Sequence, residues 1–115
     1  MNDIKAILER IRVFGAERDW QQFHSPKNIS MALSVEASEL LEHFQWMTQD
    51  QSRNIDAEKK QEVADEVADV FLYLLRMCDQ LDINLIDAAN QKIDKNALKY
   101  PVEKSKGVAT KYDRL

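Results

Sequence analysis

The stretch "EASELLEHFQW", residues 36 to 46, decides how this chain is expected to fold. Its apolar residues recur at intervals of three and four, the pattern of a helix that buries one face. Glu36 and Glu39 lie at the edge of that face, three residues apart. Carboxylates at that spacing lie about 5–6 Å apart and repel by about 3 kcal/mol at an effective dielectric near 20. Something must therefore offset their charge.

A second segment repeats this pattern 30 residues later. The stretch "EVADVFLYL", residues 66 to 74, again places an apolar stripe beside two carboxylates, Glu66 and Asp69. If the two helices pack antiparallel through their stripes, the acidic pairs face each other across a groove. The sequence thus predicts that Glu36, Glu39, Glu66 and Asp69 converge.

The remaining segments complete an all-α, four-helix bundle-like fold. Only two glycines and two prolines occur in 115 residues, which favours long helices. We expect helices over residues 2–18, 26–48, 57–81 and 85–99, with Ser25, Asp56 and Asn84 as N-caps. The polar run over residues 49–56 is predicted as a loop. Residues 1–115 are expected to form one domain, with residues 100–115 as a polar C-terminal tail.

Composition excludes several classes of protein. A net charge of −4 disfavours binding to nucleic acid or to anionic membranes. No apolar run approaches the length of a membrane span, and the N-terminus lacks the features of a signal peptide. The single cysteine, Cys78, excludes an internal disulfide. These features are typical of a cytoplasmic protein.

Two interpretations of the carboxylates compete. Oxygen ligands are those that Mg²⁺ prefers, and open coordination positions suit a polyphosphate. The plain alternative is that both acidic pairs are solvated helix surfaces. A di-iron site is disfavoured because neither His24 nor His43 follows a glutamate at three-residue spacing. Zinc lacks sufficient cysteine and histidine, and both glycine-rich phosphate-binding motifs are absent from the sequence.

Several motifs together resemble one known family. The acidic signature EASE (36–39) and EVAD (66–69) occurs with "ERDWQQFHSPKN", "EHFQW", "DVFLYL", "QKIDKNALKYP" and the terminal "KYDRL". The set is similar to MazG-like nucleotide pyrophosphohydrolases, in their dCTP pyrophosphatase branch. The resemblance implies an all-α homotetramer, a dimer of dimers, that hydrolyses nucleoside triphosphates to monophosphate and pyrophosphate. It implies that Glu36, Glu39, Glu66 and Asp69 bind Mg²⁺, for which Mn²⁺ can substitute. Either a carboxylate, with Glu36 and Glu39 as candidates, or a metal-bound hydroxide would activate the attacking water.

The resemblance also implies substrate contacts, each with a plain structural alternative. Tyr73 would stack on the sugar, or is an aromatic at the edge of the core. Trp20 and Trp46 would stack on the base, or close the core. His24 would lie near the base, or is a solvent-exposed cap residue. Lys92 and Asn96 would contact phosphate, sugar or base, although a lone helical lysine is usually solvated. Lys111 is a weaker candidate for closing over phosphates.

Two departures from the family pattern limit this transfer. Ile11 stands where animal members carry a histidine, so base recognition is expected to be looser or built differently. Val35 stands where some members carry an extra acidic residue, and Glu42 is a candidate substitute.

We therefore expect a Mg²⁺-dependent hydrolase of deoxynucleoside triphosphates, with dCTP or a modified dCTP favoured, that cleans the nucleotide pool. Broader activity that includes dATP or dUTP, and a non-catalytic helical oligomerisation module, stay open. The short helices bury a modest core, which predicts at least a homodimer. The sequence leaves the preferred base, the number of metal ions, the general base and the biological setting undetermined.

Overall fold

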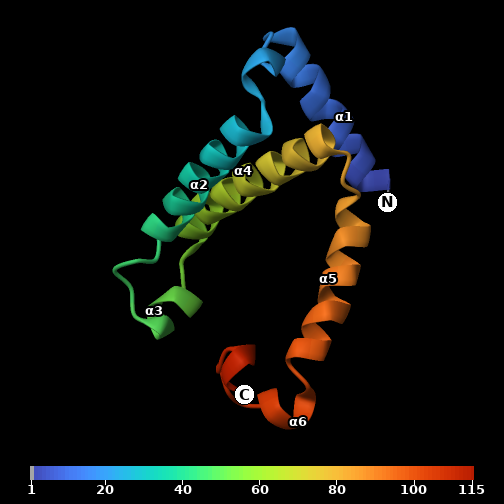
Figure 1. The fold of residues 1–115 in the computed structure, drawn as a ribbon. Helices are drawn as coiled ribbons and strands as arrows, with labels where there is room; N and C mark the ends of the chain where they lie inside the picture. The colour runs from blue at the N-terminus through green and yellow to red at the C-terminus, as the bar shows by residue number, and fades with distance from the viewer. Residues whose placement is uncertain (1) are drawn as a thin grey trace. The chain divides into compact units, whose positions relative to one another are not determined.

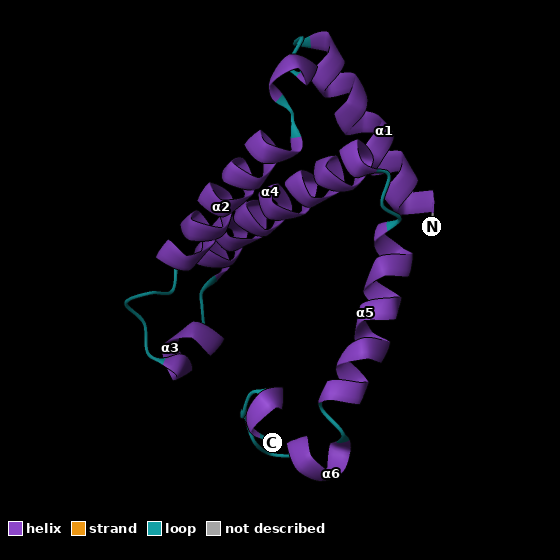
Figure 2. Cartoon of the chain, in the orientation of Figure 1, coloured by secondary structure: helices purple, strands orange, loops and turns teal. Residues whose placement is uncertain are grey.

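The computed structural model describes residues 2–115, which form two compact units, residues 2–82 and 83–115. Every regular element in the described part of the chain is helical, which confirms the predicted all-α class (Figure 2). The first unit contains α1 (Asn2–Glu17), η1 (Gln21–Phe23), α2 (Pro26–Glu42), α3 (Gln49–Arg53) and α4 (Ala57–Leu81). The second contains α5 (Leu85–Lys99), α6 (Val102–Ser105) and η2 (Tyr112–Arg114).

Local capping fixes where the two central helices begin. The Ser25 side chain accepts a hydrogen bond from the Asn28 backbone N–H at 3.2 Å, and Pro26 is the first residue of α2. The Asp56 carboxylate accepts from the Lys59 backbone N–H at 2.8 Å at the start of α4. Both predicted N-caps are therefore confirmed.

Helices α2 and α4 lie side by side and run antiparallel, as predicted (Figure 1). The most deeply buried side chains of the unit are Ile29, near the start of α2, and Leu75, near the end of α4, each 1% exposed. Their positions agree with the antiparallel arrangement, which brings the start of one helix to the end of the other. This packing sets the register of the acidic side chains in the middle of both helices.

The first helix packs against the last turns of α4. Ile11 of α1 is buried. The Arg12 guanidinium pairs with the Asp79 carboxylate, and its Nε lies 3.1 Å from Oδ2. Helix α1 ends near Gly15, whose carbonyl accepts from the Trp20 backbone N–H at 2.9 Å. The chain then turns through Asp19, which has a left-handed φ of 54°.

The predicted end of the second helix was wrong. We expected it to reach Thr48, because Phe44 and Met47 continue the apolar period, but α2 ends at Glu42. Thr48 instead caps a separate short helix, α3, within the run predicted as a loop. Thr48 and Gln51 form a reciprocal capping box, which holds the Thr48 backbone extended and is incompatible with a continuing helix.

In the second unit, the Asn84 side chain accepts from the Asp87 backbone N–H, so the predicted cap of α5 is confirmed. Residues 100–115, predicted as a polar tail, contain α6 and η2. The Tyr112 ring meets the Tyr100 ring edge-on. The Lys99 ammonium lies 4.8 Å from the centroid of the Tyr112 ring. The tail thus contacts the end of α5. That the two units form one domain, and that α5 completes a four-helix bundle, stay predictions.

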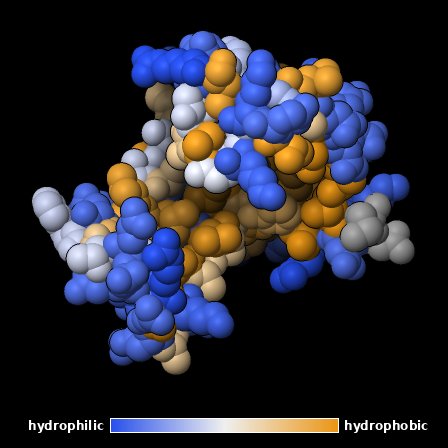
Figure 3. Space-filling model, turned by 90° about the horizontal axis from the view of Figure 1, so that it is seen from below, coloured by the Kyte–Doolittle hydropathy of each residue, from blue (hydrophilic) through white to orange (hydrophobic). Residues whose placement is uncertain are grey.

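Much apolar surface remains exposed on the single chain, as orange residues among blue ones in Figure 3 show. Part of the predicted apolar stripes is included, since Leu41 is 59% and Val67 50% exposed. None of the helices in residues 2–115 is both long and apolar enough to cross a membrane.

Candidate functional site

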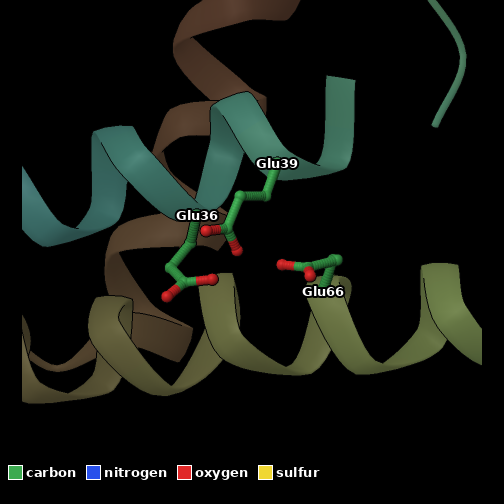
Figure 4. Close-up of side chains that lie close together, drawn as sticks. All are labelled: Glu36, Glu39 and Glu66. Carbon is green, nitrogen blue, oxygen red and sulfur yellow. The ribbon is translucent and has the colours of Figure 1, made fainter. Parts of the chain in front are cut away.

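Three of the four predicted carboxylates come together between α2 and α4. Glu36 and Glu39 extend from α2 toward α4, and Glu66 extends from α4 toward them (Figure 4). One carboxylate oxygen from each residue lies within 4.8 Å of the other two. The three-residue spacing on α2 places its two glutamates on one face, and the antiparallel packing brings Glu66 opposite them. We call Glu36, Glu39 and Glu66 the acidic cluster.

Two oxygens of this cluster are buried without a partner. Glu36 Oε2 and Glu66 Oε2 are inaccessible to solvent and accept no hydrogen bond from the described residues. Such an arrangement is costly for ionised carboxylates, because buried charge needs a counter-charge or a proton. The ion pairs among residues 2–115 include none of the three glutamates, so the described side chains supply no counter-charge to the cluster.

The pKa values of the clustered glutamates also indicate that the cluster needs a positive charge. Partial burial, followed by the neighbouring carboxylates of Glu39, Asp69 and Glu66, raises the pKa of Glu36 to about 7. Burial, followed by Glu39, also raises the pKa of Glu66. A divalent cation would reverse these shifts, and carboxylate oxygens are the ligand type that Mg²⁺ and Mn²⁺ accept. The residues present thus fit a hard divalent cation.

Asp69, the fourth predicted carboxylate, lies one turn after Glu66 and is more exposed. It is not part of the tight group, but its charge contributes to the raised pKa of both Glu36 and Glu66. Asp69 also lines a neighbouring cavity, and so links the acidic cluster to that cavity.

This cavity, of about 720 Å³, lies between α1 and α4 and is lined mainly by apolar and aromatic side chains. Trp20, His24 and Tyr73, three predicted substrate contacts, line it together with Asp69. The Trp20 ring meets the ring of Phe14 edge-on at a centroid distance of 5.6 Å, and that of His24 at 6.2 Å. The cavity therefore offers aromatic surface next to an acidic edge, within the size range of small-molecule sites. We call it the aromatic pocket.

The other predicted contacts lie elsewhere. Trp46 is 89% exposed in the turn after α2 and does not line the aromatic pocket. Lys92 and Asn96 belong to α5 of the second unit, where their four-residue spacing places them on one exposed face. Lys111 precedes η2 in the same unit. Their roles stay predictions.

Sequence reasoning missed Arg76, which lines the aromatic pocket from α4. Its Nη1 lies 3.4 Å from His24 Nδ1. The available signal was its spacing, since Arg76 follows Tyr73 by three residues and Asp69 by seven, on the same helix face. Nothing in the sequence placed α1 against that face, so the pocket itself could not be foreseen.

Comparisons with known proteins agree with this geometry. Curated relatives include dCTP pyrophosphatase 1 of Mus musculus, 38% identical over 89% of this chain, and that of Homo sapiens, 35% identical over the same share. The chain spans about three-fifths of the length of these relatives, 61% in both cases. A crystal structure of a pyrophosphatase from Archaeoglobus fulgidus superposes with a TM-score of 0.81 at 41% identity, covering 86% of this chain and 93% of that one. The profile of the MazG-like family matches residues 31–115, and the chain therefore belongs to the MazG-like family.

Proposed function

We propose that this protein is a Mg²⁺-dependent nucleoside triphosphate pyrophosphohydrolase. It acts on deoxynucleoside triphosphates, with dCTP or a modified dCTP favoured, and releases the nucleoside monophosphate and pyrophosphate. The observation that carries the proposal is the acidic cluster, with its two unpartnered buried oxygens, beside the aromatic pocket. The names of the curated relatives support the choice of dCTP.

Glu36, Glu39 and Glu66, with Asp69 at their edge, would hold the cation. When bound, a divalent cation neutralises phosphate charge and polarises the phosphoryl oxygens, which favours attack by water. An interaction module without catalytic activity gains nothing from partly buried, mutually repelling carboxylates. The cluster therefore favours the enzyme over the oligomerisation module.

The protein's own side chains position the substrate and accept a proton. A carboxylate of Glu36 or Glu39 takes the proton from the attacking water as its oxygen bonds to the α-phosphorus. The bond from the α-phosphorus to the α–β bridging oxygen breaks at the same time, and pyrophosphate leaves. Tyr73 lies seven residues beyond Glu66, about 10 Å along α4, and so offers its ring to the nucleoside when the phosphates lie at the cluster. Trp20 and His24 extend that surface from the segment between α1 and α2. Lys92, Asn96 and Trp46 add phosphate, sugar and base contacts.

A panel of natural and modified nucleoside triphosphates, assayed with Mg²⁺ for pyrophosphate against single-phosphate release, tests the proposal. Pyrophosphate release that is fastest from dCTP or its 5-modified forms supports it. Equal rates with dATP or dUTP would support the broader hydrolase. No turnover of any nucleotide would leave the helical module as the better account.

Variants of the acidic residues test the site. Glu39→Gln and Asp69→Asn each remove a charge without removing core volume, so turnover should be lost while the circular dichroism spectrum is retained. Glu58→Gln, an exposed glutamate in the first turn of α4, serves as the control and should retain turnover. Full activity in both site variants would overturn the assignment.

The protein is also proposed to act as a homo-oligomer, a dimer or a dimer of dimers. Support comes from the exposed apolar residues of its central helices, which include Val35 and Leu41 on α2 and Val67 on α4. Monomers rarely expose large contiguous apolar patches. Light scattering at micromolar concentration should give at least the mass of a dimer, and a monomer mass would contradict this.

A further inference from the structure

Arg76 is a half-buried cation inside the aromatic pocket, and the proposed function gives it no role. The ion pairs among the described residues do not include it. Arg10 and Arg18 also line the pocket. Arg18 is engaged differently from Arg76, because its guanidinium lies 3.5 Å from the Phe14 ring centroid and donates to the Phe14 carbonyl. Among residues 2–115, the one hydrogen-bond contact of the Arg76 side chain is with His24, so several of its N–H donors have no acceptor there.

Two residues shape the place where the Arg76 guanidinium lies. Gly15 of α1 is buried, and a Cβ built on it would lie only 3.3 Å from Arg76 Nη1. A glycine inside a helix makes that helix less stable than an alanine would. At this position, the missing side chain leaves room for the guanidinium against α1.

His24 contacts the same nitrogen of the guanidinium, Nη1. Arginine can only donate, so the contact at 3.4 Å makes His24 Nδ1 the acceptor and places the ring proton on Nε2. Burial, followed by the charge of Arg76, lowers the pKa of His24 and keeps the ring neutral. His24 therefore occupies one N–H of Nη1, and the other N–H groups of the guanidinium remain for a ligand.

The position of Arg76 along α4 indicates which part of a nucleotide it meets. Arg76 follows Glu66 by ten residues, about 15 Å along the helix axis, with Tyr73 between them. If the phosphates lie at the acidic cluster and the sugar near Tyr73, the base is the part that reaches Arg76. A basic side chain placed this far from the cluster is poorly placed to bind the phosphates.

We propose, on the basis of the proposed function, that Arg76 determines base specificity by donating two hydrogen bonds to adjacent acceptors on cytosine, O2 and N3. A guanidinium presents parallel donors that match paired acceptors. Uracil and thymine carry a proton on N3, so a donor there would face the donors of Arg76. An unpaired buried donor costs binding energy, and cytosine is therefore preferred.

The test compares binding of the α,β-imido analogues of dCTP and dUTP, which are not hydrolysed at the α–β bond, by calorimetry with Mg²⁺. Wild-type protein should prefer the dCTP analogue by about tenfold or more, as expected for a bidentate contact that reads a base. Arg76→Gln should bring the two affinities within about threefold of each other. Arg76→Lys, which keeps the charge but not the paired donors, should lie between. Arg53→Gln, which changes an exposed arginine of α3 outside the aromatic pocket, is the control and should retain the wild-type ratio of the two affinities.

Binding of imidodiphosphate with Mg²⁺, which has no base, separates the two proposals. The affinity for imidodiphosphate should be the same in wild type and in all Arg76 variants. Equal affinities would show that the acidic cluster is intact in the variants. The inference would be overturned if the ratio of affinities for the dCTP and dUTP analogues were unchanged in the Arg76 variants. It would also be overturned if Arg76→Gln and Arg76→Lys bound both analogues equally more weakly than wild type. The hydrolase proposal would stand in either case. The absence of wild-type preference for the dCTP analogue would also overturn the inference. Failure of wild type to bind or hydrolyse any nucleotide would refute the proposed function, and the inference with it.

Discussion

Neutralising Glu36 should make the metal-free protein more stable and at the same time remove most of its stabilisation by Mg²⁺. In Glu36→Gln, the side chain keeps its shape but no longer repels its neighbours. Carboxylate oxygens of Glu36 and Glu39 lie within 4.8 Å, a separation at which two charges repel by about 1 kcal/mol in water and about 3 kcal/mol at a dielectric of 20. Because the side chains are partly exposed, we expect the lower part of this range, about 1–2 kcal/mol.

Thermal and urea unfolding at one fixed protein concentration measure this effect, first with a chelator and then across a Mg²⁺ titration. Without metal, the variant should melt higher by roughly 5 °C. With Mg²⁺ at a hundredfold excess over its dissociation constant, wild type should gain about 2.7 kcal/mol. The variant should gain much less, because it has lost a ligand.

The pH dependence adds a second check on the same variant. The folded-state pKa of Glu36, about 7, lies above its ordinary value of 4.5. A carboxyl group with a raised pKa costs stability as pH rises through the interval between the two values. The advantage of Glu36→Gln without metal should therefore be small near pH 4.5 and complete above pH 7.

Glu58→Gln is the control, since Glu58 is an exposed glutamate in the first turn of α4 and lies outside the acidic cluster. It should keep the wild-type response to Mg²⁺. The reasoning would be refuted if Glu36→Gln were less stable than wild type without metal and still gained the full Mg²⁺ stabilisation.

Two further predictions concern the scaffold that positions the site. Asp79→Asn should lower the unfolding midpoint at neutral pH, because it removes the charge that pairs with Arg12. The Arg12 guanidinium lowers the pKa of Asp79 below its ordinary 3.8. The stabilisation from this ion pair is therefore present above pH 3.8 and is lost as pH falls through the lower, folded-state pKa. Urea titrations at several pH values should show the wild-type advantage shrinking in acid, and a constant difference would contradict the ion-pair explanation. Ser25→Ala should cost about 1 kcal/mol by removing the cap at Asn28 N–H, measured by urea unfolding, whereas Ser25→Asp should retain most of the stability. Equal stability of the alanine variant and wild type would show that the cap contributes nothing.

Features set by neighbouring residues could be predicted from the sequence. Ser25, Asp56 and Asn84 each cap the helix that follows, because a cap depends only on a side chain and a backbone N–H three residues away. The short helix α3 was missed for a related reason, since Thr48 and Gln51 carry a capping signal inside a polar run that otherwise reads as a loop. The apolar spacing through Met47 predicted a continuous helix, whereas the capping box of Thr48 and Gln51 starts a new one, as the structure has it.

The candidate site was foreseen only where a repeated pattern fixed its geometry. Equivalent positions of Glu36 and Glu66 beside matching apolar stripes indicated that they would face each other, and they do. The aromatic pocket depends on how α1 lies against α4, which no periodicity specifies. The proximity of Arg76 to Gly15, and its place in the pocket, follow from that contact and could not be predicted from the sequence.

The most direct test of the central claim is a calorimetric titration of wild-type protein with Mg²⁺ or Mn²⁺ in the presence of the α,β-imido analogue of dCTP. The account predicts uptake of the cation, and loss of that uptake when Glu36 and Glu39 are both replaced by glutamine. A wild-type protein that takes up neither cation, with or without the nucleotide analogue, would contradict it.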